Sequence, residues 1–204
     1  MINPKEYLET GFKLHGHKCP AMPLGLRVGA AAMNALGVER ATDGQLIALV
    51  ELGEAHCSHC FADGIQVITG CTFGKGNIHQ LGYGKFGLTL IDVASKRAVR
   101  VVPKAEVQVA TKQTEFFKNY REKGIPASKV PAKVVEPLIE RVMDTPDEQL
   151  MNISPIFDYE VKQHKESFES FVCEQCGDMV VEKYGRVYHG LKVCIPCQEK
   201  LIAG

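Results

Sequence analysis

The segment GHKCPAMPLGLRVGAAAMNALG, residues 16–37, joins a short Cys/His stretch to a helix built largely from small residues. Over residues 24–35 apolar and small side chains recur at helical spacing, and Gly37 stands where a left-handed residue would end the helix. Because small side chains let backbones approach closely, we expect this helix to pack tightly against another element. A thiol and imidazoles at its N-terminus would sit in a positive potential, which favours thiolate formation and metal coordination.

The segments around this helix mix helices and strands, which predicts an α+β core over residues 1–165. Asn3 and Pro4 predict a first helix that ends near Gly11. Thr145 and Glu148 have the spacing of a capping box at the start of another helix. The other expected elements are a strand at 45–52, a helix from the second Cys/His segment to about 68, a glycine-rich loop at 70–87, strands at 88–93, 98–102 and 106–110, helices ending near 123 and 143, and an extended stretch at 153–161.

Two Cys/His segments of the core, HGHKC at residues 15–19 and HCSHC at residues 56–60, form a candidate site. If the second segment is helical, its residues three apart share a face, and Cys60, Asp63 and Gln66 form one stripe toward a common pocket. A lone Cys or His is usually a packing or polar residue, but this clustering favours a metal or reactive-thiol site. The ligands that we expect to contribute are His17, Cys19, Cys60 and Cys71. They would hold a second Zn²⁺ or another transition metal, with an open position that activates water or polarises a carbonyl.

The C-terminal region contains a second, separate constellation. Cys173 and Cys176 form one C-x2-C pair, and Cys194 and Cys197 form another after 17 intervening residues. This is the spacing of a structural four-thiolate zinc site, although iron or a redox dithiol pair is compatible with it. The order of knuckle, hairpin and short helix at 198–202 resembles a treble-clef zinc finger, to which we assign residues 166–204. A module this small needs the metal for much of its folding free energy.

Composition excludes several classes of function. The chain has 24 Lys and Arg against 24 Asp and Glu, so its net charge of zero disfavours nucleic-acid binding. The sequence contains no apolar stretch long enough to cross a membrane and no secretory signal at its start, so we expect a cytoplasmic protein. Eight cysteines in a reducing compartment favour thiol and metal chemistry over disulfides.

Residues 16–37, together with CFADGIQVITGCTFGKGNI at 60–78, resemble the two signature blocks of the FmdE family of archaea and bacteria, which is named after a component of formylmethanofuran dehydrogenase. The resemblance implies an α+β core, followed in some members by a treble-clef zinc finger, and a tight homodimer. It also implies association with the molybdenum or tungsten enzyme that reduces carbon dioxide onto methanofuran in methanogenesis. It implies a fold more than a reaction.

The family's motif falls on specific residues of both blocks. These are His17, Cys19, Pro20, Gly25 and Arg27 in the first block, and Cys60, Asp63, Gln66, Gly70, Cys71, Thr72, Gly74, Lys75, Gly76 and Asn77 in the second. We expect the two blocks to meet in a cleft. There Cys60, Asp63 and Lys75 are the candidate catalytic residues, and Arg27, Gln66 and Thr72 are the candidate cofactor-binding residues. The glycine-rich loop lacks the order of a phosphate loop, so anion binding beside Lys75 and a purely structural turn stay open as alternatives.

Three functions compete on this evidence. The first is a metal- or thiolate-dependent enzyme or accessory protein of one-carbon or redox metabolism. The second is a metal-sensing or regulatory protein whose finger contacts a protein or nucleic acid, and this requires metal-linked partner affinity. The third is a non-catalytic subunit that docks on a larger enzyme. An open coordination position distinguishes the first function from the third.

Overall fold

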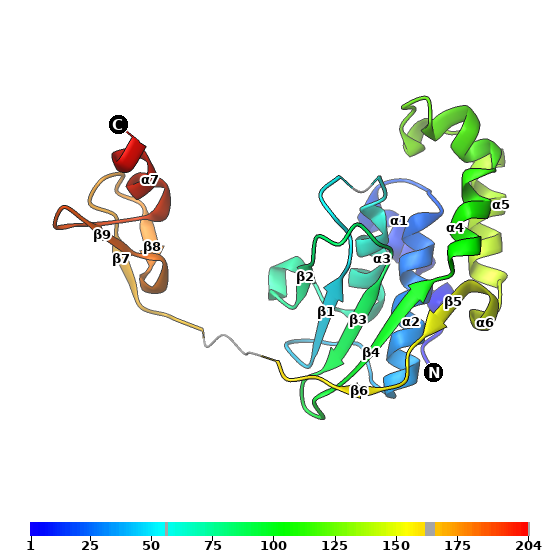
Figure 1. The fold of residues 1–204 in the computed structure, drawn as a ribbon, viewed down its shortest axis with the longest axis horizontal. Coiled ribbons are helices and arrows are strands. Elements are labelled where there is room, and N and C mark those ends of the chain that lie inside the picture. The colour runs from blue at the N-terminus through cyan, green and yellow to red at the C-terminus, as the bar shows by residue number, and fades with distance from the viewer. Residues whose placement is uncertain (56, 162–165, 204) are drawn as a thin grey trace. The chain divides into compact units, whose positions relative to one another are not determined.

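The computed structural model describes residues 1–55, 57–161 and 166–203. The chain forms two compact units, the core unit Met1–Val161 and the finger unit Lys162–Gly204. The core unit combines a sheet with helices, and the finger unit combines two short hairpins with one helix (Figure 1). The predicted α+β class with a C-terminal finger is confirmed.

The core unit is built on a mixed sheet in the order β2-β1-β3-β4-β5, with β6 paired to β4. Strand β2 runs parallel to β1, and the other pairs are antiparallel. Leu88 lies opposite Val101 and Leu90 opposite Val99, and all four side chains are buried in the main core. The strands are β1 (Leu46–Val50), β2 (Ile78–Gln80), β3 (Leu88–Asp92), β4 (Arg97–Pro103), β5 (Met151–Ile153) and β6 (Phe157–Asp158). The strands expected at 45–52, 88–93 and 98–102 are thus present.

Helices α2 (Ala21–Leu36) and α3 (Cys60–Thr69) cross in backbone contact beside the sheet (Figure 1). A Cβ atom on Gly25 would lie 2.0 Å from the carbonyl oxygen of Phe61. One on Gly64 would lie 2.1 Å from that of Met22. Any side chain at either position would push the helices apart, so the expected close packing of the small-residue helix is confirmed. The crossing brings the starts of α2 and α3 together.

The first helical segment is longer than expected. A turn, η1 (Pro4–Tyr7), capped by Asn3, leads into α1 (Leu8–His15), which ends at Gly16 with φ of 86°. The predicted end near Gly11 is wrong because that glycine serves packing: a Cβ atom there would lie 2.5 Å from the sulfur of Met22. The continuation carries His15 to the end of the helix.

The remaining core helices follow β4 and differ from expectation at two places. The predicted strand at 106–110 is wrong: it is helix α4, in which half-buried Val107 packs against the core while Val109 is exposed. The predicted capping box is also wrong, because the Thr145 hydroxyl donates to the carbonyl of Arg141 and Pro146 occupies the cap of α6. The segments are η2 (Phe73–Lys75), α4 (Ala105–Lys112), a π-helical turn η3 (Phe116–Arg121), η4 (Ala127–Lys129), α5 (Ala132–Asp144) and α6 (Asp147–Leu150). Among the described residues, no helix is both long and apolar enough to cross a membrane.

The finger unit has the predicted order of knuckle, hairpin and helix. Two antiparallel pairs, β7 with β8 and β9 with β10, precede the last helix. The elements are β7 (Ser170–Val172), β8 (Met179–Val181), η5 (Glu182–Tyr184), β9 (Arg186–Tyr188), β10 (Leu191–Val193) and α7 (Ile195–Ala203). Its small core consists of Cys173, Val193 and Cys197 with a few half-buried neighbours. So little apolar burial fits a unit that depends on a bound metal.

Candidate metal centre and cavity

The candidate core site lies where α1 ends and where α2 and α3 begin. His15 is the last residue of α1, Cys19 precedes α2 by two positions, and Cys60 is the first residue of α3. One ligand atom each of His15, His17 and Cys19 lies within 4.8 Å of the others. The two imidazole rings lie with centroids 4.2 Å apart. Three metal-ligating side chains from one short segment therefore converge on one point.

The orientation of His15 is fixed by an acidic residue. Its Nδ1 lies 2.8 Å from Oδ2 of Asp63 on α3, while its Nε2 is buried without a hydrogen-bond partner among the described residues. A buried polar nitrogen without a partner is unfavourable, and a metal ion would satisfy it. A carboxylate on the far nitrogen is the usual second neighbour of a metal-ligating histidine.

Cys19 is poised as a thiolate. The Cys60 thiol donates a hydrogen bond to its sulfur, and this contact, with backbone N–H groups of Met22 and Ala21 at the start of α2, lowers the pKa of Cys19 to about 6 despite its burial. The same contact and burial raise the pKa of Cys60, so Cys60 is the protonated member of the pair. Burial, with the charges of His15 and Arg121, lowers the pKa of His17 and favours its neutral, ligating form. The donor set of two imidazoles and one thiolate therefore suits Zn²⁺ or a related transition metal.

The cluster forms part of the wall of a cavity of about 610 Å³ in the core unit. Besides the Cys/His residues, helix α4 and the turn η3 contribute much of the lining. The lining residues are His15, His17, Cys19, Pro20, Ala21, Leu24, Cys57, Ser58, His59, Cys60, Phe86, Val107, Gln108, Thr111, Lys112, Phe116, Phe117, Arg121, Pro126, Ala127 and Val142. A largely apolar cavity of this size beside a few polar groups is typical of a small-molecule site.

The second Cys/His segment lies at the cavity but not on a helix. Residues 57–59 precede α3, so the expected shared helical faces do not form there. The His59 Nε2 atom lies 3.1 Å from the carbonyl oxygen of Gly53, and Cys57 is exposed. His56 lies outside the described residues. Cys57 and His59 therefore belong to the cavity wall, and the closely spaced cluster is His15, His17 and Cys19.

The structure separates Cys71 from this cluster. Its sulfur is buried and donates to the carbonyl oxygen of Leu46 at 3.5 Å, and burial raises its pKa to about 11. It does not line the cavity. A thiol that is hard to ionise and faces the sheet is poorly suited to hold a metal. The closely spaced cluster contains His17 and Cys19 of the expected ligand set together with His15, and it contains neither Cys71 nor Cys60, whose thiol is protonated beside Cys19.

The polar residues of the second block stabilise its own loop. Gln66 donates from Nε2 to Oδ1 of Asp63 at 3.3 Å and accepts from the N–H of Phe73. The Thr72 N–H donates to Oδ1 of Asn77, and Lys75 donates to the carbonyl oxygens of residues 41 and 42. None of Gln66, Thr72 and Lys75 lines the cavity. Asp63, through His15, and Cys60, through Cys19, are the residues of this block that contact the cluster.

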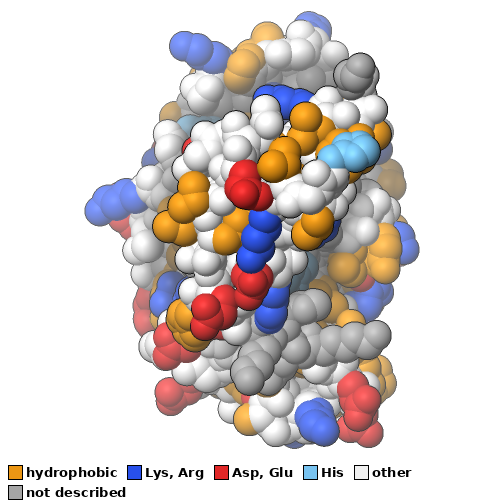
Figure 2. Space-filling model, turned by 90° about the vertical axis from the view of Figure 1, so that its left-hand side faces the viewer, with side chains coloured by type: hydrophobic (Ala, Val, Ile, Leu, Met, Phe, Trp, Pro, Cys, Tyr) orange, Lys and Arg blue, Asp and Glu red, His pale blue; other side chains and the backbone are white. Residues whose placement is uncertain are grey.

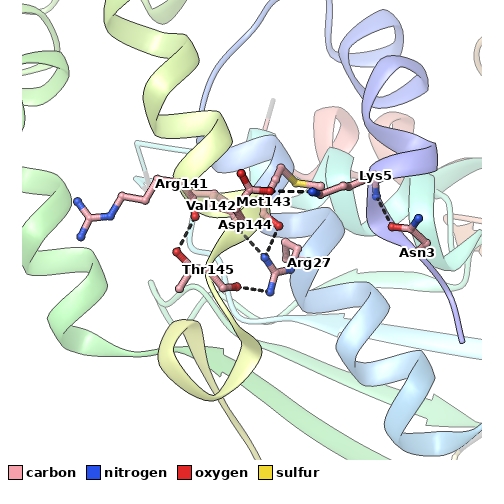
Figure 3. A network of polar contacts seen from close by, with 8 residues as sticks. All are labelled: Asn3, Lys5, Arg27, Arg141, Val142, Met143, Asp144 and Thr145. Carbon is pink, nitrogen blue, oxygen red and sulfur yellow. Dashed lines mark hydrogen bonds and ion pairs between the residues drawn. The ribbon is translucent and has the colours of Figure 1, made fainter.

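Arg27 also lies outside the cavity and holds the end of α5 (Figure 3). Its guanidinium donates to the carbonyl oxygens of Val142, Met143 and Thr145 at 2.6–2.8 Å and to a carboxylate oxygen of Asp147 at 2.5 Å. The side chain is only 8% exposed. These bonds tie the α5–α6 turn to α2, and the expected cofactor contact of Arg27 stays a prediction.

The four cysteines of the finger unit form a compact cluster of their own. Their sulfurs all lie within 4.8 Å of one another, as four ligands of one tetrahedral ion must. Burial raises the pKa of Cys173, but backbone N–H groups of Cys176, Cys194 and Gln175 outweigh it and bring the pKa to about 6. Gly177, with φ of 80°, allows the tight turn of the first knuckle. This arrangement agrees with the predicted structural zinc site.

Comparison with protein families agrees with the fold and the position of the cluster. The model of the family described as FmdE, molybdenum formylmethanofuran dehydrogenase operon, matches residues 14–152, well over half of the chain. The chain belongs to the FmdE family. A model of the prokaryotic dksA/traR C4-type zinc finger matches residues 166–202. Both parts of the chain expected from the sequence therefore have family counterparts.

Two proteins are similar to this FmdE protein over most of its length. A crystal structure of an FmdE-like protein of the tungsten formylmethanofuran dehydrogenase type, from Syntrophus aciditrophicus, has 21% identity and a TM-score of 0.64, covering 97% of this chain and 92% of the other. This likeness shows the fold. A protein of Archaeoglobus fulgidus described as a probable S-adenosyl-L-methionine-binding protein is 31% identical over 199 residues. The match covers 91% of this chain, which spans half the length of that protein.

Sequence reasoning missed two parts of the candidate site. His15 was outside the expected ligands, although its place beside His17 and Cys19 in HGHKC was a usable signal. The α4 wall of the cavity was missed because residues 106–110 were interpreted as a strand. The face drawn in Figure 2 carries acidic, basic and hydrophobic side chains.

Proposed function

We propose that the core unit holds one transition-metal ion, with Zn²⁺ the first candidate, through His15, His17 and Cys19, and that it acts on a small molecule bound in the cavity. The buried Nε2 of His15, without a partner among the described residues, carries this proposal, because Asp63 occupies Nδ1 and leaves Nε2 as the ring nitrogen available to an ion shared with Cys19 and His17. Such an ion, when bound, supplies Lewis-acid chemistry toward a carbonyl or a water molecule.

The chain's own residues have distinct tasks in this proposal. Asp63 fixes the tautomer and orientation of His15, and Cys60 stabilises the Cys19 thiolate by donating to it. The apolar cavity walls keep bulk water from a bound ligand. The family description, which refers to a formylmethanofuran dehydrogenase operon, supports a role as an enzyme or accessory protein of one-carbon or redox metabolism.

The printed name of the Archaeoglobus relative raises S-adenosyl-L-methionine as an alternative ligand. Its sulfonium group is a cation. Lys112 and Arg121 line the cavity, no carboxylate is among the lining residues that the structure describes, and the Cys19 thiolate is assigned to the metal in this proposal. This charge balance is unfavourable for a sulfonium, so we do not extend that ligand to this cavity.

Metal analysis of matched histidine variants tests the proposed function. Protein purified without a histidine tag or added metal should hold two metals per chain, and His15→Ala should remove one. His79→Ala changes an exposed histidine of β2 that is outside the cluster and should retain both. Full metal content in His15→Ala would contradict the ligand assignment. A core metal with no exchangeable position would instead favour the non-catalytic docking subunit.

A further inference from the structure

The part of the cavity that does not consist of Cys/His residues is strongly apolar. Six of its side chains are aromatic or branched aliphatic. They are Leu24, Phe86, Val107, Phe116, Phe117 and Val142. At about 610 Å³ the cavity has room for a ligand of several carbon atoms besides a reacting group. The ligand body must therefore be apolar, because a polar body would lose its hydration without gaining hydrogen bonds.

Apart from the Cys19 thiolate, which the proposed function assigns to the metal, the charged side chains that line this cavity in the described chain are basic. Lys112 on α4 and Arg121 on η3 line it, and no Asp or Glu does so within the described chain. Lys112 is exposed, and the described residues offer it no hydrogen bond or ion pair. Arg121 is half-buried and donates from Nη1 to the carbonyl oxygen of Ile125 at 2.7 Å, which leaves most of its five N–H donors available. Unpaired cations beside an apolar cavity are suited to an anionic ligand.

The start of α2 adds to this positive potential. Pro20 and Ala21 line the cavity at the N-terminus of a 16-residue helix, where the helix dipole favours negative charge. The two basic side chains and the positive end of the α2 dipole therefore all contribute positive potential to the same cavity. A neutral or cationic ligand would gain nothing from them.

We propose that the cavity binds an organic anion with an apolar body, whose carboxylate or phosphate is bound by Arg121 and Lys112 while its body contacts the aromatic side chains of η3. The role of the neighbouring metal rests on the proposed function, but the preference for an anion arises from residues that are not metal ligands. The two inferences are therefore separable by experiment.

A matched set of ligands tests this preference on the full chain. The probes are 4-phenylbutyrate, 4-phenylbutyl phosphate, 4-phenylbutanol and 4-phenylbutylamine, which share a body and differ in charge. Calorimetric titration at low salt should give at least about tenfold tighter binding for an anion than for the alcohol, the equivalent of one charge-assisted hydrogen bond. The better of the two anions identifies the head group. Equal binding of the alcohol, or tighter binding of the amine, would overturn the proposal.

Side-chain variants locate the anion. Lys112→Gln and Arg121→Gln should each reduce the preference for the anion severalfold, whereas Arg121→Lys should largely retain it. Lys118→Gln, on the same turn but outside the cavity lining, is the matched control. An equal loss in the control would mean general surface attraction and would overturn the proposal.

Metal-depleted protein separates this proposal from the proposed function. The preference for an anionic probe over the alcohol should persist after the metal is removed by chelation and dialysis. If it disappears with the metal and is insensitive to Lys112→Gln and Arg121→Gln, the metal binds the anion and the present proposal fails while the metal site stands. If the untreated core holds no metal but the preference persists, the proposed function fails and the anion site stands.

Discussion

Asp63 Oδ2 lies 2.8 Å from Nδ1 of His15, and this contact connects the second signature block to the residue that directly precedes the first. Asp63 stands one turn into α3, and His15 ends α1. Gln66, one turn further along α3, donates to the other carboxylate oxygen of Asp63. The second block thus supplies the residue that orients the proposed ligand His15. In the glycine-rich loop, the N–H of Phe73 donates to Gln66 and so supports this arrangement.

Asp63→Asn should therefore weaken metal binding without removing a ligand. Loss of the carboxylate next to a metal-ligating histidine reduces affinity about 10- to 100-fold. Competition of the purified protein with a chelator measures this change. Asp158→Asn, at an exposed position of β6, should leave the affinity unchanged. Wild-type affinity in Asp63→Asn would mean that this contact does not support a metal ligand.

Much of the fold was predictable because it depends on local patterns. The small residues of α2 recur at helical spacing, and the strands β1, β3 and β4 read as short apolar runs. The ligand set was less predictable. Cys71 lies two residues after the end of α3, and the turn at Gly70 places its sulfur next to the carbonyl of Leu46. Only the tertiary packing of α3 on the sheet decides this.

Cys71→Ala should retain the core metal. The sulfur is buried and away from the cluster, so the variant loses only part of a packing contact, on the order of 1 kcal/mol of unfolding free energy. Cys19→Ala should in contrast lose the core metal. Elemental analysis of the two variants shows directly which of the two buried thiols is needed to hold the core metal. Metal loss from Cys71→Ala with an intact fold would restore the ligand set expected from the sequence.

Arg27→Met should destabilise the core unit by about 3 kcal/mol, because it leaves the buried carbonyl oxygens of the α5–α6 turn without donors. Arg141→Met is a suitable control, since its exposed guanidinium points away from this network (Figure 3). Urea unfolding of both variants measures the difference. If Arg27→Met is as stable as Arg141→Met, Arg27 is not needed for the fold.

Glu51 predicts a pH dependence of stability. Hydrogen bonds from Arg100, at 2.5 and 2.7 Å, hold the pKa of this buried carboxyl below its ordinary value of 4.5. The pair thus stabilises the folded state above pH 4.5, and this stabilisation is lost as pH falls through the lower, folded pKa. Glu51→Gln should reduce the unfolding free energy by roughly 2 kcal/mol at pH 7.

Unfolding at neutral and at acidic pH tests this sign. The difference between wild type and Glu51→Gln should shrink as pH falls below 4.5, while the exposed Glu54→Gln should match wild type throughout. A difference that grows toward acidic pH would contradict the assignment of the charged pair.

The cavity was also missed in the sequence, because one of its walls was predicted as a strand. Residues 106–110 alternate apolar and polar side chains over a short stretch, which favours a strand locally. In the fold this segment follows β4 as a helix, and Val107 lines the cavity while Val109 is exposed. The positive charge of the cavity wall, from Lys112 and Arg121, depends on this helical continuation. The sequence alone does not predict that these residues line one cavity.

The central claim is a core metal site that is independent of the finger. Elemental analysis of metal per chain, for the full chain and for a chain truncated before residue 166, tests it most directly. The core unit has its own compact fold, so the truncated chain should be stable. The account predicts two metals in the full chain and one after truncation. One metal falling to none would contradict it and leave His15, His17 and Cys19 without a metal to hold.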